Sequence, residues 1–229
     1  MRWTSCSIAL SAALAFAAPA QARDYVRISD ERTYTSWSHV TTGSVVRAAP
    51  SHRARRLGRV QTRTFIGSPE VVVVLGRQGG WSRVRYARLG ASVGWVPTRV
   101  LGATRVSRSL ITVDLRAQRL RAYRLGKLLL SVRVAIGAPD SPTPRGVFFL
   151  RERVVPRPLT GPYGVLALGL NAFSPQRTDW IGGGQVAIHG TNQPGLIPGR
   201  VSNGCVRLRN ADVRRLGRVV GLGTPVRVR

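Results

Sequence analysis

The chain has 229 residues and a formal charge of +27, because 36 lysines and arginines face only 9 aspartates and glutamates. This length suits one large or two small domains. The charge predicts polyanionic surroundings, either nucleic acid or an anionic envelope polymer, although an arginine-rich proteome would also raise it. Since the basic residues are spread along the chain and no nucleic-acid-binding motif is visible, we expect no nucleic-acid partner.

The N-terminal residues have the pattern of a secretory signal peptide. Arg2 precedes the apolar run Ile8–Ala18, and Ala20 and Ala22 are the small residues that a signal peptidase reads. The run is shorter than the roughly 20 residues that a transmembrane helix needs, and no later stretch is long and apolar enough to span a bilayer. We therefore expect cleavage after residue 22 and export to a periplasm, the cell wall or the extracellular space.

Cleavage would leave Cys205 as the only cysteine, because Cys6 lies within the signal peptide. An exported chain with one thiol cannot form an internal disulfide. Cys205 is then a buried small residue, an intermolecular link or a reactive group. One cysteine and three histidines also argue against a metal site built from thiolates.

Residues 45–102 have the pattern of short strands joined by turns, which predicts a small β-barrel. Residues 23–44 are expected to be a leader or linker, and residues 103–109 a linker between two domains. The expected elements of the first domain are a strand at Glu70–Leu75, a turn at 76–80, a strand at Trp81–Tyr86, and extended segments at Gly94–Val96 and Thr98–Leu101.

Residues 110–229 are predicted to form a second β-rich domain with one helix, so the fold class is mainly β. Gly126 and Lys127 suit a two-residue type II′ hairpin turn. A helix is expected to start near Asn210, which can cap it, with an apolar face formed by Val213, Leu216, Val219 and Val220. The expected strands are Gln118–Leu125, Leu128–Ile136, Val147–Leu150 and Thr224–Arg229.

The residues that can carry chemistry lie near the end of the chain. His189 ends an apolar strand and is followed by glycine, and sixteen residues later Cys205 opens another β-prone run. Adjacent strands would bring the two side chains together. A thiol is only slightly ionised at neutral pH, so it benefits from an imidazole that accepts its proton or pairs with the thiolate.

Two further features surround this pair. The backbone N–H groups of Gly204 and Cys205 are candidates for stabilising an oxyanion. Arg207 would share a strand face with Cys205, where it can bind a substrate carboxylate. Each residue taken singly has a simpler explanation, since a lone cysteine is usually a small buried residue and arginine is common here. Their combination in one segment favours catalysis.

The segments His189–Thr191 and Ser202–Arg207 resemble the signature of the L,D-transpeptidases with a YkuD-type catalytic domain. The turn Pro142–Gly146 resembles the Pro-Thr-Pro-x-Gly element of the same family, and the resemblance extends over about residues 108–229. Many members have a second histidine where this chain has Asn203, so no role is expected for a second histidine. Three short segments of the first domain resemble bacterial Src-homology-3-like domains, which implies a targeting role: Val46–Pro50, Gly80–Val84 and Gly94–Val96.

The catalytic resemblance implies that peptidoglycan stem peptides are the substrate. Cys205 would attack the carbonyl of the third residue of a tetrapeptide stem, release D-alanine and pass the acyl group to an amine, forming a 3→3 cross-link. Water or a lipoprotein lysine as acceptor would instead give L,D-carboxypeptidase or protein-anchoring activity. The implied roles are general base and acid for His189, an orienting carbonyl at Gly190, an oxyanion site shaped by Ser202, Asn203 and Gly204, and a carboxylate contact at Arg207.

The resemblance further implies that catalysis needs no metal and no organic cofactor, and that carbapenems acylate Cys205. Papain-like peptidases place the cysteine before the histidine, which is the reverse of the order here. Sortases have their histidine much further upstream. The non-enzymatic alternative is a wall-binding protein that has lost activity.

Overall fold

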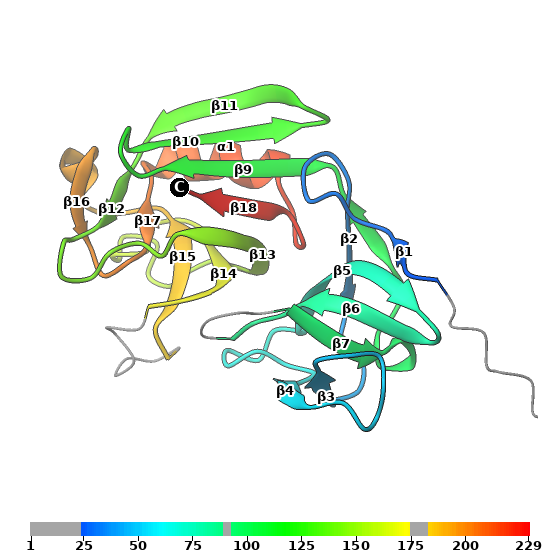
Figure 1. Ribbon diagram of the computed structural model, residues 1–229. Coiled ribbons are helices and arrows are strands. Elements are labelled where there is room, and N and C mark those ends of the chain that lie inside the picture. Colours follow the sequence, from blue (N-terminus) through cyan, green and yellow to red (C-terminus); the bar gives the residue numbers. More distant parts are fainter. Residues whose placement is uncertain (1–23, 89–92, 175–182) are drawn as a thin grey trace, which may run out of the picture.

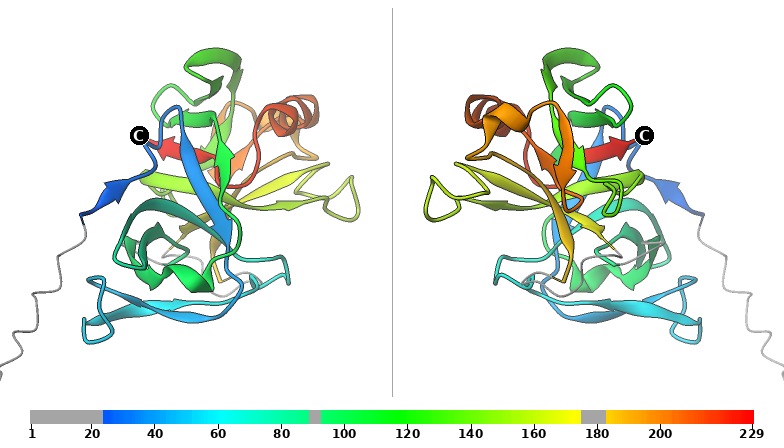
Figure 2. Two further views of the ribbon diagram at one scale, coloured as in Figure 1. Left: turned by 90° about the vertical axis from the view of Figure 1, so that its right-hand side faces the viewer. Right: turned by 90° about the vertical axis from the view of Figure 1, so that its left-hand side faces the viewer.

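The computed structural model describes residues 24–88, 93–174 and 183–229. The described residues form two β-sheets and an α-helix, α1 (Asn210–Val219). Figures 1 and 2 show one sheet above the other, with α1 on the upper sheet, at the end of the molecule away from the lower one. The predicted mainly β class is confirmed. The predicted signal peptide lies outside the described residues and stays a prediction.

The first sheet has the strand order β4-β3-β7-β6-β5-β2-β8, and β1 pairs with β5. Valines at alternate strand positions form its core. A short 3-10 helix, η1 (Thr98–Val100), follows β7 where an extended segment was expected. The strands are β1 (Val26–Arg27), β2 (Thr35–His39), β3 (Ser44–Arg47), β4 (Arg56–Val60), β5 (Val71–Gln78), β6 (Trp81–Arg85), β7 (Val93–Pro97) and β8 (Arg105–Ser107).

Three strands of this sheet lie in segments that we expected to be linkers. β1 and β2 fall within residues 23–44 and β8 within residues 103–109, and β2 pairs with β5 on one side and β8 on the other. The sequence of β2 is Thr-Ser-Trp-Ser-His, which lacks the apolar alternation of a half-buried strand, yet Thr35, Ser36 and Ser38 are buried. Backbone hydrogen bonds to β5 on one edge and to β8 on the other hold β2 in the sheet. The Src-homology-3-like assignment of residues 45–102 stays a prediction.

The second sheet has the strand order β11-β10-β9-β18-β13-β14-β15-β17-β12-β16. Helix α1 packs on β10 and β11 through Val213 and Leu216, which belong to the main core, as the predicted apolar face requires. Within the described ranges, no helix is long and apolar enough to span a bilayer. The strands are β9 (Ser109–Asp114), β10 (Arg119–Arg124), β11 (Lys127–Arg133), β12 (Ala135–Gly137), β13 (Gly146–Val154), β14 (Ala167–Phe173), β15 (Gln185–His189), β16 (Gly199–Ser202), β17 (Val206–Arg207) and β18 (Pro225–Val228), and a 3-10 turn, η2 (Pro194–Leu196), precedes β16.

The hairpin between β10 and β11 differs from the prediction. Its two turn residues are Leu125 and Gly126, with φ values of 50° and 79°, and Lys127 already belongs to β11. Two successive positive φ angles define a type I′ turn rather than the predicted type II′ turn, because type II′ needs a positive φ only at its first central residue. The predicted turn residues, Gly126 and Lys127, were therefore wrong by one position, and the predicted turn type was wrong as well.

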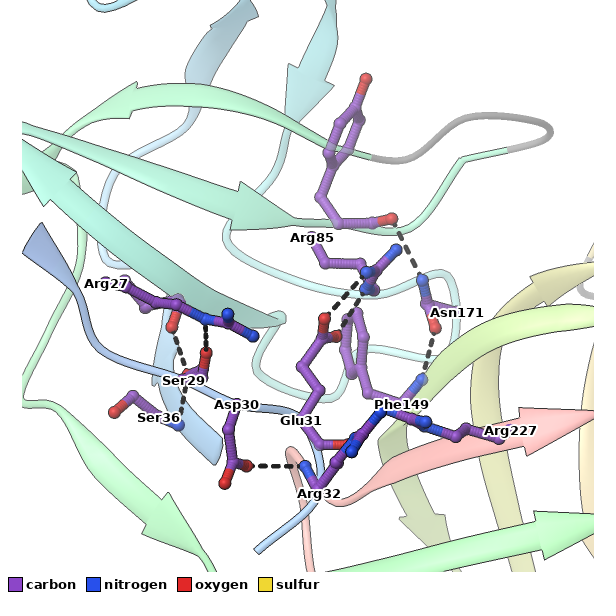
Figure 3. A network of polar contacts seen from close by, with 12 residues as sticks. Arg27, Ser29, Asp30, Glu31, Arg32, Ser36, Arg85, Phe149, Asn171 and Arg227 are labelled. Carbon is purple, nitrogen blue, oxygen red and sulfur yellow. Dashed lines mark hydrogen bonds and ion pairs between the residues drawn. The ribbon is translucent and has the colours of Figure 1, made fainter. Parts of the chain in front are cut away.

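The two sheets share a buried interface. Trp37, Val71 and Val73 of the first sheet form one apolar cluster with Phe149 of β13. Asn171 of β14 accepts a hydrogen bond from the Phe149 N–H at 2.7 Å and donates one to the Tyr86 carbonyl of the first domain at 3.3 Å (Figure 3). The two domains are therefore packed against each other through core contacts.

Ion pairs reinforce this interface. Glu70, just before β5, binds Arg151 of β13 through two hydrogen bonds, and both side chains are buried. Glu31 pairs with Arg85 at 2.9 Å, and its carbonyl accepts a hydrogen bond from Arg227 of β18 (Figure 3). The first domain thus contacts β13 and β18, two neighbouring strands of the second sheet.

Candidate active site

Parallel pairing of β15 and β17 brings the candidate residues together. Ile188 lies opposite Val206 and His189 opposite Arg207. Ile188 and Val206 point into the core and are fully buried. Because side chains alternate along a strand, His189 and Arg207 point to the opposite face.

Cys205 lies beside the same strand. The Ala187 N–H, two residues before His189, donates a hydrogen bond to the Cys205 Sγ at 3.4 Å. The thiol therefore lies on the face that carries His189 and Arg207. The three residues that the sequence singled out around the thiol share one surface of the sheet.

The backbone around Cys205 is held by neighbouring residues. The Ser202 hydroxyl donates to the Cys205 carbonyl at 2.6 Å, so Ser202, buried at the end of β16, supports the turn that carries the thiol. Gly204 has a φ of 101°, which a residue with a side chain rarely adopts. An added Cβ there would lie only 3.6 Å from the Pro142 carbonyl oxygen, which places the predicted Pro142–Gly146 turn beside the site. Asn203 is exposed.

Burial keeps the Cys205 thiol in its neutral form. Only 8% of the residue is exposed, and this burial raises the thiol pKa, while the Ala187 N–H and the positive charge of Arg207 act in the opposite direction. The resting thiol is therefore protonated and needs a base if it is to attack a carbonyl.

His189 is arranged as a neutral base. Its Nδ1 lies 2.5 Å from the Gly190 carbonyl oxygen, and since a carbonyl can only accept, Nδ1 carries the proton and Nε2 is left to accept one. Burial lowers the pKa of His189 to about 4; the Gly190 bond opposes this shift and the Arg207 charge adds to it. The imidazole is therefore uncharged at neutral pH.

Arg207 supplies the positive charge of the site. It lowers the pKa values of Cys205 and of His189, so it favours a thiolate and disfavours an imidazolium. Its Nε is buried without a hydrogen-bond partner among the described residues. An unpaired buried donor next to the thiol suits an anionic substrate group.

Two residues near His189 were missed by sequence reasoning. The Tyr163 ring lies against the imidazole with 5.0 Å between centroids. Burial, together with the negative charge that Cys205 carries once it is ionised, raises the pKa of Tyr163 to about 12. No local pattern in the sequence connects Tyr163 with His189. Asn210 was predicted to cap α1, but the N-cap residue is Arg209, and the Asn210 side chain bonds to the segments around Gly164 and Gly190 instead.

The described residues contain no group of three or more His, Cys, Asp or Glu side chains placed to hold a metal ion. The groups gathered here are a thiol, an imidazole with a free acceptor nitrogen, and a guanidinium. Such a set suits acyl transfer through a thioester.

Residues 108–228 match the YkuD family, described as the L,D-transpeptidase catalytic domain. This match covers more than half of the chain, and the chain therefore belongs to that family.

Two curated relatives and one solved structure show the extent of the similarity. The YkuD proteins of Bacillus licheniformis and Bacillus subtilis, whose names assign them to the L,D-transpeptidases, are 36% and 31% identical to this chain over 118 residues. These alignments cover 52% of this chain and 64% of each relative, so the chain spans less than two thirds of their length. The structure of Bd1075 from Bdellovibrio bacteriovorus is 30% identical, with a TM-score of 0.43, over 54% of this chain and 48% of that one.

Proposed function

We propose that this protein is a peptidoglycan L,D-transpeptidase in which Cys205 is the nucleophile and His189 the base. Family membership supports the reaction class. The observation that carries the residue assignment is the parallel pairing of β15 with β17, which puts the thiol and a neutral imidazole on one face. The bond from Nδ1 to Gly190 leaves Nε2 as the acceptor.

In the first half-reaction, Nε2 of His189 takes the proton of the Cys205 thiol as Sγ attacks the carbonyl carbon of the third stem residue. The tetrahedral oxyanion is stabilised by backbone N–H groups near Gly204 and Cys205. Collapse of this intermediate breaks the amide bond to D-alanine, whose nitrogen receives the proton from His189. The product is a thioester on Cys205 and free D-alanine.

In the second half-reaction, a side-chain amine of a neighbouring stem attacks the thioester. His189 accepts a proton from this amine, the C–S bond breaks, and the proton returns to Sγ. The new amide is a 3→3 cross-link. With water as the acceptor the same site would act as an L,D-carboxypeptidase, and with a lipoprotein lysine it would anchor a protein.

Arg207 fits the role of carboxylate binder in this scheme. Its guanidinium is partly buried, and its Nε has no hydrogen-bond partner in the part of the chain that the structure describes, whereas a stem peptide offers carboxylates near the scissile bond. The chain's charge of +27 further suits anionic wall polymers as surroundings. Export to the wall, predicted from residues 1–22, would bring the enzyme to this substrate.

The test is incubation of the mature protein with purified tetrapeptide muropeptides, followed by mass spectrometry of the products. Cross-linked dimers, trimmed tripeptides and protein adducts separate the three acceptors. The Cys205→Ala variant is expected to release no D-alanine, and its circular dichroism should match that of the wild type. Turnover by this variant would rule out the thiol mechanism. Wild-type protein that binds sacculi but leaves muropeptides unchanged would favour the inactive wall-binding alternative.

A further inference from the structure

Asn210 is the first residue of α1, yet its side chain does not cap that helix. Its Oδ1 instead accepts two backbone hydrogen bonds from elsewhere in the domain. The Thr191 N–H donates at 3.2 Å and the Val165 N–H at 3.4 Å. One side-chain oxygen thus ties together two chain segments that lie far apart in sequence.

The backbone is shaped to admit this oxygen. A Cβ placed on either Gly164 or Gly190 would lie 2.2 Å from Asn210 Oδ1, closer than any real contact. Gly164 also has a φ of 61°, which favours glycine. Both glycines precede the residues whose N–H groups bond to Asn210. The close approach therefore explains glycine at two positions that the sequence alone left without a reason.

Both tied segments contact the His189 imidazole. The Thr191 N–H belongs to the same peptide group as the Gly190 carbonyl, and that carbonyl accepts the Nδ1 proton of His189. Val165 lies two residues after Tyr163, whose ring packs on the imidazole. A rotation of either segment would change the tilt or the tautomer of His189.

We propose that Asn210 is a positioning residue for catalysis. By fixing the Gly190–Thr191 peptide plane and the Tyr163 segment, it holds the His189 Nδ1–H on a carbonyl and so keeps Nε2 available for the thiol. This inference rests on the proposed function, in which His189 is the base. Asn210 itself touches neither the substrate nor the reacting atoms.

The test compares Asn210→Ala, which removes the acceptor, with Asn210→Asp, which keeps it and adds a negative charge. The control is Asp212→Ala in the same helical turn, where the side chain faces Arg215. Asn210→Ala is expected to lower kcat by about 10- to 100-fold with little change in KM, because a small misplacement of a base costs roughly this much. Asn210→Asp should retain most of the rate but move the acid limb of the pH profile to higher pH, because the carboxylate favours the imidazolium.

Two measurements keep the inference separate from the proposed function. The rate of Cys205 alkylation by iodoacetamide reports on the base without a substrate, and the His189 Nδ1–H proton resonance reports on the bond to Gly190. Asn210→Ala should slow alkylation and weaken or broaden that resonance. If Asn210→Ala does not fold, the Asn210→Asp variant tests the inference by itself, through the predicted shift of the acid limb of its pH profile to higher pH.

Three results would overturn the inference. They are wild-type kcat and alkylation in Asn210→Ala, an unshifted profile in Asn210→Asp, and equal losses in the Asp212→Ala control. In each case a Cys205→Ala variant that stays inactive would leave the proposed function intact. An active Cys205→Ala variant would instead refute the proposed function.

Discussion

Replacing Arg151 by methionine should destabilise the protein more than replacing its partner Glu70 by glutamine. Arg151 Nε and Nη2 bind the two carboxylate oxygens of Glu70 at 2.7 Å and 2.5 Å, and its Nη1 lies 3.6 Å from Glu152 Oε1. The exposed fractions are 8% for Arg151, 5% for Glu70 and 3% for Glu152. Methionine at 151 would leave two buried carboxylates without this cation. Glutamine at 70 would leave Arg151 its contact with Glu152.

The magnitude follows from this asymmetry. Removing one partner of a buried pair costs about 3–5 kcal/mol, because the other charge stays buried without compensation. We expect a loss of that size in the free energy of unfolding for Arg151→Met. A hydrogen bond to a charged group contributes about 1.5–3 kcal/mol, and Glu70→Gln should cost no more than this. Typical domains have only about 5–15 kcal/mol in total, so the difference is measurable.

Urea denaturation followed by tryptophan fluorescence provides the assay, because Trp37 lies in the interface that Arg151 joins. The control is Arg215→Met, which removes a pair with Asp212 at 3.8 Å in which the Arg215 side chain is 63% exposed. Its expected cost is below about 1 kcal/mol. Equal or reversed losses for Arg151→Met and Glu70→Gln would refute the reasoning from two buried carboxylates.

Four further predictions concern the domains and the site. Deletion of residues 24–102 exposes Phe149 and removes Glu70 from Arg151, so the remaining chain should lose its cooperative unfolding transition; a stable, active fragment would contradict this and show that the first domain is not needed for the fold of the second. Because burial lowers the pKa of His189 from 6.5 to about 4, kcat/KM should hold as pH falls below 6.5 and decline only near 4, whereas an acid limb centred near 6.5 would contradict this. Over the same range the unfolded chain takes up a proton that the folded chain does not, so stability should fall as pH drops from 6.5 towards 4. Incubation with a carbapenem should add one adduct in intact-mass spectra of the wild type and none in Cys205→Ser; an adduct in both would place acylation elsewhere.

Local patterns in the sequence were sufficient for the fold class and for the candidate pair. The apolar face of α1 follows from the spacing of Val213 and Leu216, since a helix repeats every 3.6 residues. His189 and Cys205 stand out because each lies next to a glycine and beside a short β-prone run, only sixteen residues apart in the chain. Their juxtaposition needs only that the two flanking runs pair as strands.

The tertiary structure determined what depends on distant residues. β2 has no apolar alternation of its own and is a strand because β5 and β8 supply partners for its backbone. The low pKa of His189 arises from its burial in the folded protein, and the local sequence around His189 does not predict that burial. Asn210 is of a residue type that often caps helices, yet its Oδ1 accepts hydrogen bonds from the Thr191 and Val165 N–H groups. These bonds form only in the folded chain, where two glycines without side chains leave room for the Asn210 oxygen.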